Sequence, residues 1–356
     1  MNIQEIDKNF AIETHIDKPD VVFHDVTGDW CRLYGVIPPP DDKIWFRRMS
    51  QEVADKVNIG VAQLNSNSAG GRVRFCTDSP YVALHAEVAG SPMLNMSAYG
   101  RAGFDLYMKR EGGQAYLRTL GGFEETLDVC HDMPSREMRE YTLTLPLYSA
   151  VRHVYIGLAK DAVIQPPPPY TYERPVVFYG SSITQGGCAS RSGNSYQGFI
   201  SRRLDMNYLN LGFSGSAKGE TTMAEYIAGL DMSAFVYDYD HNAPTPEHLE
   251  TTHKPMFDII RKAQPDLPIV MVSKPSFRLC EGETTRVDTD RRFAIIKATY
   301  DAAVAAGDTN VYLIDGREMM AELTAGEGSC DTCHPNDLGF ATMAKAIGDV
   351  LEKILT

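Results

Sequence analysis

A serine and an Asp-x-x-His string stand far apart in this chain, and together they could carry out acyl transfer. Ser182 follows an apolar run at residues 176–179, and Asp331 stands three residues before His334 near the end of the sequence. A serine hydroxyl becomes an effective nucleophile when a histidine takes its proton, and a carboxylate orients that histidine. These residue types predict Ser182 as nucleophile, His334 as general base and Asp331 as the residue that orients the base.

Acyl transfer also needs hydrogen-bond donors for the oxyanion of the tetrahedral intermediate. Gly215 follows the apolar run at residues 208–211 and could offer a backbone N–H that no side chain covers. Asn242 follows the run at residues 235–237 and could offer its side-chain amide. We predict an oxyanion hole made of these two donors and the N–H of Ser182.

Three further polar residues adjoin these positions and are candidates for the substrate pocket. Ser181 precedes the predicted nucleophile, His241 precedes Asn242, and Lys274 follows the apolar run at residues 269–272. A lysine in such a position is often simply solvated, and His241 could equally be a satisfied histidine.

Each predicted catalytic residue also has a simpler structural explanation. A serine in a Gly-Ser-Ser loop and an asparagine before Ala-Pro are common turn residues. Gly215 could serve only to permit a positive φ angle. An Asp-x-x-His string before a helix could serve as a cap. The occurrence of all these residues after successive strands, or before the last helix, favours the catalytic interpretation.

The elements that must position these residues form an alternating pattern in the second half of the chain. Short apolar runs alternate with segments of helical spacing, which predicts a parallel sheet covered by helices on both faces. Ligands in such sheets bind at the carboxyl ends of the strands. The runs lie at residues 176–179, 208–211, 235–237, 269–272 and 311–314.

The first half of the chain has a different pattern of apolar and polar residues. Short alternating runs separated by turn residues are typical of an all-β sandwich of jelly-roll type. The prolines at residues 166–169 cannot continue a helix or a central strand. We predict a β-sandwich domain over residues 1–165, a proline-rich linker over 166–173 and a catalytic domain over 174–356.

The composition limits the classes of partner that the protein can bind and the cellular compartment in which we expect it. The net charge of −13 and the pI near 5.2 argue against binding to a nucleic-acid backbone. No segment approaches the roughly 18 apolar residues of a membrane helix. The first eight residues lack the basic start and apolar run of an export signal. The seven cysteines have no framework spacing, so we expect reduced thiols and a cytoplasmic location.

Taken together, the four blocks resemble the SGNH/GDSL hydrolase superfamily, whose members supply Ser, Gly, Asn and a final Asp-x-x-His in this order. Ser182, Gly215, Asn242 and the pair Asp331 and His334 match these blocks. Ser181 and Asp240 stand where the superfamily usually has Asp and Gly. Residues 103–107, Gly-Phe-Asp-Leu-Tyr, resemble the GxDLY motif of the β-sandwich that precedes some members.

The resemblance implies a flavodoxin-like catalytic domain with a five-stranded parallel sheet. It also implies a serine esterase or acyltransferase, often one that acts on acetylated sugars. The expected partner is a small-molecule or carbohydrate ester with a small acyl group, acetyl being favoured. No metal and no organic cofactor is expected, because the triad accounts for the chemistry.

Three alternatives stay open. The same triad could transfer the acyl group to an alcohol other than water. The sandwich could bind sugar beside an inactive hydrolase domain. Cys330, Cys333 and His334, with Cys188 near the serine, could form a metal or redox site, although a fourth ligand is not readable and a metal would use up His334. The acyl group, the alcohol and the oligomeric state stay undetermined.

Overall fold

The computed structural model describes residues 12–39, 45–90, 93–121, 123–277, 282–321, 323 and 327–356. The first eight residues, on which the expectation of no export signal rests, lie outside these ranges. Within these ranges, no helix is both long enough and apolar enough to cross a bilayer.

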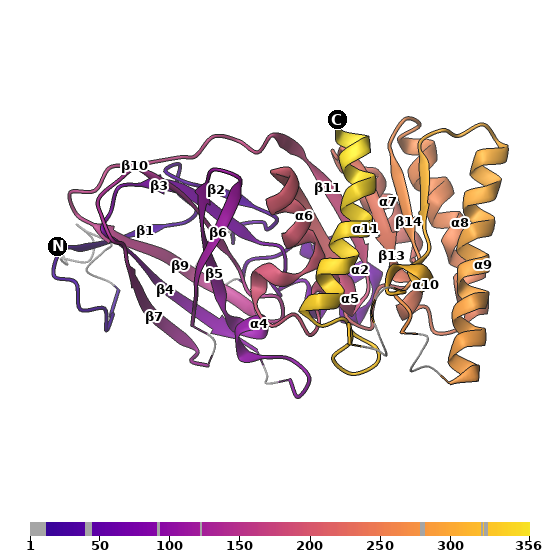
Figure 1. Ribbon diagram of the computed structural model, residues 1–356, viewed down its shortest axis with the longest axis horizontal. Coiled ribbons are helices and arrows are strands. Elements are labelled where there is room, and N and C mark those ends of the chain that lie inside the picture. Colours follow the sequence, from indigo (N-terminus) through magenta and orange to yellow (C-terminus); the bar gives the residue numbers. More distant parts are fainter. Residues whose placement is uncertain are drawn as a thin grey trace.

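A parallel sheet of five strands forms the centre of the C-terminal half (Figure 1). The strand order is β12-β11-β13-β14-β15, and each neighbouring pair is parallel. The predicted flavodoxin-like sheet is therefore confirmed. Ser182 follows β11, where the strand order reverses and where sheets of this kind bind ligands. The strands are β11 (Tyr172–Gly180), β12 (Met206–Gly212), β13 (Ala234–Asp238), β14 (Ile269–Val272) and β15 (Val311–Ile314).

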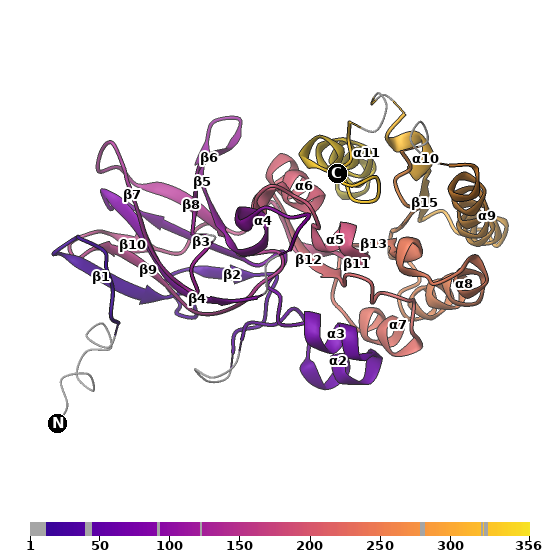
Figure 2. The same ribbon diagram turned by 90° about the horizontal axis from the view of Figure 1, so that it is seen from below.

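Helices cover both faces of this sheet, as the alternating pattern predicts (Figure 2). Val176 and Phe178 of β11 pack in the core that contains α6 and α11, whereas Val177 and Tyr179 pack in the core that contains α7, α8 and α9. One strand serves two cores because its side chains alternate between the faces. The helices of this half are α5 (Ser182–Gln185), α6 (Tyr196–Leu204), α7 (Thr221–Ala228), α8 (Pro246–Ala263), α9 (Glu283–Ala305), α10 (Gly316–Met319) and α11 (Asp337–Leu355), with the 3₁₀ helices η2 (Ser192–Asn194) and η3 (Tyr239–Asn242).

Two antiparallel sheets make up most of the N-terminal half, which confirms the predicted all-β domain there. Their strand orders are β1-β9-β4-β7 and β10-β3-β8-β5-β6, and β2 pairs with β3. The jelly-roll type and the borders at residues 165 and 174 stay predictions. The elements are β1 (Val21–Asp25), β2 (Arg32–Tyr34), β3 (Arg72–Thr77), β4 (Tyr81–Ala89), α4 (Ala98–Ala102), β5 (Phe104–Arg110), β6 (Gly113–Leu120), β7 (Thr126–Asp132), β8 (Arg139–Thr144), β9 (Ala150–Ala159) and β10 (Ile164–Gln165).

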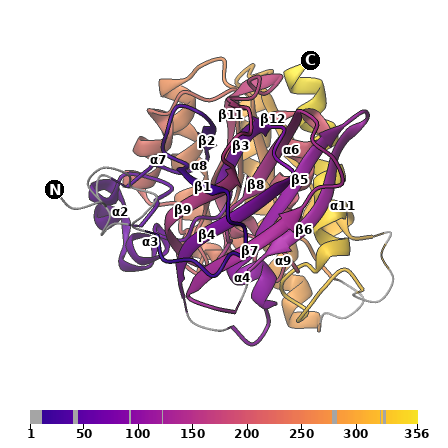
Figure 3. The same ribbon diagram turned by 90° about the vertical axis from the view of Figure 1, so that its left-hand side faces the viewer.

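Two helices of the N-terminal half, α2 (Gln51–Val57) and α3 (Ile59–Leu64), pack against the parallel-sheet half, beside α7, instead of the sandwich (Figure 2). In Figure 3 both helices lie to one side of the sandwich strands. Ala54 and Val61 are fully buried in the same core as Phe213. The buried Arg48 donates to the carbonyl oxygens of Asn210 (3.1 Å) and Gly212 at the end of β12. The two halves of the chain therefore share a core, which the sequence pattern did not predict.

Asp105, the acidic residue of the GxDLY-like motif, joins the sandwich to the second half of the chain. Its carboxylate is fully buried and accepts hydrogen bonds from the Arg191 guanidinium (2.8 Å), the Gly193 N–H (2.9 Å) and the Thr119 hydroxyl (2.6 Å). The loop at residues 191–194 lies shortly after Ser182. The sandwich thus holds a segment that follows the candidate nucleophile in the chain.

Candidate active site

The serine loop depends on a glycine at the end of β11. A Cβ at Gly180 would collide with the Asp238 carboxylate and the Thr184 hydroxyl. Ser181 then caps α5, since its hydroxyl accepts from the Ile183 N–H at 3.1 Å. Ser182 is the first residue of α5, so its own N–H belongs to the helix start, where backbone donors lack intrahelical partners. Ser181, a predicted pocket residue, is 1 % exposed and serves as this cap.

A chain of hydrogen bonds connects Ser182, His334 and Asp331. The Ser182 Oγ lies 2.8 Å from His334 Nε2, and His334 Nδ1 lies 2.9 Å from Asp331 Oδ2. The other carboxylate oxygen of Asp331 accepts from the His334 N–H at 2.7 Å. Asn336, and not Asp331, caps α11 by accepting from the Gly339 N–H. The Asp-x-x-His string therefore acts as a carboxylate–imidazole pair aimed at a serine hydroxyl.

Hydrogen bonds at this site change the pKa values of both Asp331 and His334. Burial by itself would raise the pKa of Asp331, but the backbone N–H of His334, the Asn95 amide and the His334 ring hold it well below its usual value. The hydrogen bond with the Cys333 side chain has the larger effect in raising the pKa of His334, and that with Asp331 the smaller one. Together they raise this pKa to about 9, although burial would lower it. Asp331 is therefore ionised, and His334 holds a proton more tightly than a free histidine does.

Two residues of the N-terminal half touch this site, and neither was identified from the sequence. The Asn95 side-chain amide donates to Asp331 Oδ2 at 3.0 Å, and the buried Tyr148 hydroxyl donates to the Ser182 carbonyl at 3.1 Å. No spacing or motif in the chain points to either residue. They contact the site only because the sandwich packs beside the strand ends.

The predicted oxyanion donors lie on two neighbouring turns. Gly215 has a φ angle of +66°, and among the described residues no atom outside its two chain neighbours lies within 4 Å of the position that a Cβ would occupy. The Asn242 amide donates to the Phe213 carbonyl at 2.9 Å, and the Ser214 N–H donates to the Gln185 side chain at 3.0 Å. Asn242 and α5 are therefore both tied to the turn that contains Gly215.

The other two predicted pocket residues lie at the same edge of the sheet. His241 Nε2 is 3.0 Å from the sulfur of Cys333, the residue directly before His334. The Lys274 N–H donates to the Asp240 carboxylate at 3.1 Å. Burial raises the pKa of Asp240, and the hydrogen bond from the Lys274 backbone N–H is the largest effect that counters the rise. The structure thus brings His241 to Cys333, whereas Lys274 is held through its backbone beside the segment that contains Asn242.

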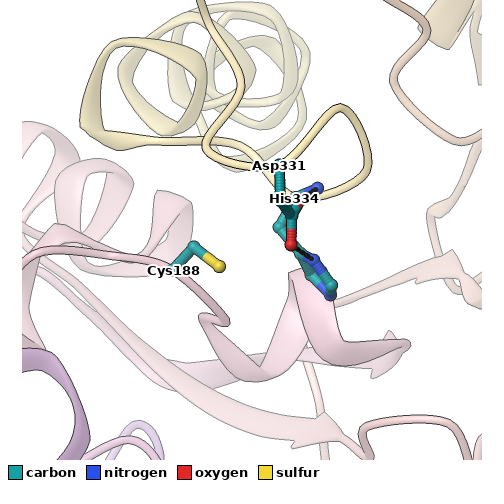
Figure 4. Close-up of side chains that lie close together, drawn as sticks. All are labelled: Cys188, Asp331 and His334. Carbon is teal, nitrogen blue, oxygen red and sulfur yellow. Dashed lines mark hydrogen bonds and ion pairs between the residues drawn. The ribbon is translucent and has the colours of Figure 1, made fainter. Parts of the chain in front are cut away.

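A metal ion would compete with the hydrogen bonds of the site. In the part of the chain that the structure describes, the ligand atoms of Cys188, Asp331 and His334 lie within 4.8 Å of one another. Figure 4 shows the Cys188 sulfur directed toward the other two side chains. Asp331 and His334 are already bonded to each other, and His334 also to Ser182. The arrangement as it stands is suited to proton transfer from the serine.

Two family models match the chain. The model of the GDSL-like lipase/acylhydrolase family matches residues 173–352. A second model, which describes the N-terminus of SGNH-hydrolase-type esterases and is named for its GxDLY motif, matches residues 21–164. A comparison with curated proteins gave no match.

Solved structures of similar proteins cover nearly the whole chain. A protein of Bacteroides ovatus described as a GDSL-like lipase is 29% identical, with a TM-score of 0.84 over 94% of this chain and 98% of its own. The salicylyl-acyltransferase SsfX3 of a tetracycline biosynthetic pathway is 19% identical, with a TM-score of 0.78 over 95% and 98%. A family two carbohydrate esterase of Clostridium thermocellum, solved with cellohexaose, is 16% identical, with a TM-score of 0.59 over 81% and 93%. The last two show the fold alone.

Proposed function

Because this chain belongs to the GDSL-like lipase/acylhydrolase family and is a carboxylic ester hydrolase of the SGNH type, we propose that it cleaves small acyl esters through Ser182, His334 and Asp331. The observation that carries the proposal is the hydrogen-bond chain from the Ser182 hydroxyl through His334 to Asp331, with distances of 2.8 Å and 2.9 Å. Nucleophile, base and orienting carboxylate are then within reach of one another.

In the proposed reaction, Ser182 Oγ attacks the ester carbonyl while His334 Nε2 takes the hydroxyl proton. Asp331 holds the imidazole through Nδ1 and stabilises its charged form. His334 then gives the proton to the leaving alcohol, and an acyl-enzyme remains on Ser182. A water molecule, deprotonated by His334, attacks the acyl-enzyme and releases the acid.

The negative charge that develops on the carbonyl oxygen is stabilised by the N–H groups of Ser182 and Gly215 and by the Asn242 amide. The left-handed backbone at Gly215 and the open space around its Cα support this assignment. The Asn242 amide has two hydrogens, and its bond to Phe213 uses one of them. Donors that are fixed before the reaction act mainly on the transition state.

We propose an acetylated carbohydrate as the substrate. The support comes from the carbohydrate esterase of the same fold and from polar side chains at the site, such as His241 and Asn95, which could bond sugar hydroxyls. The fold of a salicylyl-acyltransferase supports the second candidate, acyl transfer to an alcohol. The ratio of free acid to transferred ester in the presence of an added alcohol distinguishes hydrolysis from acyl transfer.

The cytoplasmic location stays a prediction that cell fractionation can test.

The proposed function is tested by substituting the two adjacent serines. Ser182→Ala should abolish the hydrolysis of nitrophenyl acetate and of acetylated sugars, because the nucleophile is lost. Ser181→Ala should keep a measurable fraction of the rate and lose about 1 kcal/mol of stability, because only a helix cap is removed.

Labelling by a fluorophosphonate identifies the reactive serine directly. We expect the label on Ser182. A label on Ser181 would reverse the assignment, and a folded protein without any label would favour an inactive hydrolase domain beside a sugar-binding sandwich. Nitrophenyl esters of rising chain length, compared with a panel of acetylated sugars, then define the acyl group.

A further inference from the structure

A thiol and an imidazole form a second pair directly beside the proposed triad. The Cys333 sulfur lies 3.0 Å from His241 Nε2. The Cys333 N–H donates to Asp331 Oδ1 at 3.1 Å, so the residue is anchored on the carboxylate that also holds His334. Neither the Cys333 sulfur nor the His241 ring makes or breaks a bond in the proposed mechanism.

The pair lacks the third member of a catalytic triad. The Nδ1 atom of His241 is buried and has no hydrogen-bond partner in the part of the chain that the structure describes. No carboxylate therefore orients this imidazole for repeated proton transfer. A half-buried thiol next to an imidazole is instead the environment of a cysteine that reacts as a thiolate.

We propose that Cys333 is a thiol-modification site at which a low-molecular-weight disulfide, such as oxidised glutathione, reversibly blocks the esterase. The Cys333 sulfur attacks one sulfur of the disulfide and forms a new S–S bond. The old S–S bond breaks, and the leaving thiolate departs with the electron pair and takes a proton from solvent. An added dithiol reverses the exchange and restores the free cysteine.

The acidity of the neighbouring cysteines selects Cys333 for this exchange. The hydrogen bond with His241, followed by the contact with His334, lowers the pKa of Cys333 to about 6. Burial, followed by the charges of Cys330 and Asp331, raises the pKa of Cys188 well above its usual value. At neutral pH, Cys333 is thus a thiolate and Cys188 a thiol, and the thiolate is the attacking species.

The attached group would block the site by its bulk. Cys333 lies in contact with both His241 and His334, and His241 directly precedes Asn242. A glutathionyl group on this sulfur would occupy the space that an ester needs between the base and the oxyanion donors. This blocking effect rests on the proposed function of Ser182 and His334, whereas the reactivity of Cys333 does not.

The test uses the full chain, modified with oxidised glutathione at pH 7 and assayed with nitrophenyl acetate at pH 9.5 after the reagent is removed. At this assay pH most of His334 is neutral in both forms. A tenfold loss of rate can therefore not come from its protonation and reports the added bulk. We expect the rate to fall at least tenfold, with one glutathionyl group on the Cys333 peptide, and dithiothreitol to restore the rate. The Cys130→Ser variant, which removes a half-buried thiol of β7, should lose the same fraction as the wild type.

In the Cys333→Ser variant, the ratio of treated to untreated rate should stay near one. The proposal is wrong if this variant loses the same fraction as the wild type, if the adduct responsible is on Cys330 or Cys188, or if fully modified protein keeps its rate. Fluorophosphonate labelling of the untreated protein tests the proposed function separately from the proposed modification site. If Ser182 is not labelled, the proposed function is wrong, but mapping of the glutathione adduct still shows which cysteine reacts.

A second variant tests whether the pair, and not simple exposure, makes Cys333 reactive. His241→Gln removes the imidazole that lowers the cysteine pKa. The pH at which the modification rate is half-maximal should therefore rise by at least about one unit, toward the value of an ordinary cysteine, while His334 still lowers the pKa. An unchanged midpoint would show that His241 does not activate the sulfur and would overturn the proposed pair.

Discussion

At the scale of single residues, Asn242 is held in place before any substrate arrives. Its amide donates to the Phe213 carbonyl at 2.9 Å, two residues before Gly215. We expect Asn242→Ala to lower kcat by about 10²–10³ with little change in KM, because the donor acts on charge that develops in the transition state. Steady-state kinetics on nitrophenyl acetate measure both constants. An effect confined to KM would mean that Asn242 binds the ground state of the substrate.

The acidity of His334 predicts an alkaline pH dependence. The base must be neutral to accept the Ser182 proton, and the pKa of His334 is raised to about 9 by Cys333, with Asp331 adding to the rise. The neutral fraction therefore grows as the pH rises through 9, and kcat/KM should rise with it and then level off. At lower pH, the protonated imidazole cannot act as the base.

Cys333→Ser removes the largest cause of that rise in pKa. The midpoint of the kcat/KM profile should fall by at least about one unit, toward the value of an ordinary histidine. The Cys130→Ser variant controls for the loss of a thiol far from the site and should keep the wild-type midpoint. If the midpoint of Cys333→Ser does not move, Cys333 does not set the acidity of the base.

At the scale of elements, β5 holds the loop that follows α5. Asp105→Asn replaces a buried carboxylate by an amide that cannot accept from Arg191, Gly193 and Thr119 together. Removal of one partner leaves the other buried groups unpaired, so we expect a loss of about 3 kcal/mol in the free energy of unfolding. Denaturant unfolding measures this loss. Asp161→Asn, at an exposed ion pair with Arg136, should change the unfolding midpoint little. Equal effects of the two substitutions would contradict the role given to Asp105.

At the scale of the whole molecule, the shared core links the folding of the two halves. A fragment of residues 170–356 loses α2, α3 and Arg48, which exposes Phe213 and leaves the carbonyls of Asn210 and Gly212 without their guanidinium donor. We expect this fragment to unfold at a much lower temperature than the full chain, or not to fold at all, as measured by circular dichroism. Co-expression with residues 1–169 should restore both folding and esterase activity. A fragment that folds and matches the full chain in rate would show that the halves are independent.

Much of the fold could be predicted from local patterns. Apolar runs separated by helical spacing predicted the parallel sheet, and alternating runs predicted the antiparallel half, because both follow from the period at which side chains face a core. The helices α2 and α3 were not predicted, because the prediction for this half of the chain rested on alternating runs and turn residues. Their burial depends on a core that belongs to the other half of the chain.

The sequence by itself determined which residues could perform acyl transfer and that they would gather at one edge of a parallel sheet. Ser182 after a strand and the Asp331–His334 spacing are local features, so the printed chain is enough to find them. Only the tertiary structure decided which neighbours surround them. Asn95 reaches Asp331, and His241 reaches Cys333, across 236 and 92 positions of the sequence. Contacts between such distant segments leave no periodicity or spacing in the chain, because they arise from the packing of one folded surface on another.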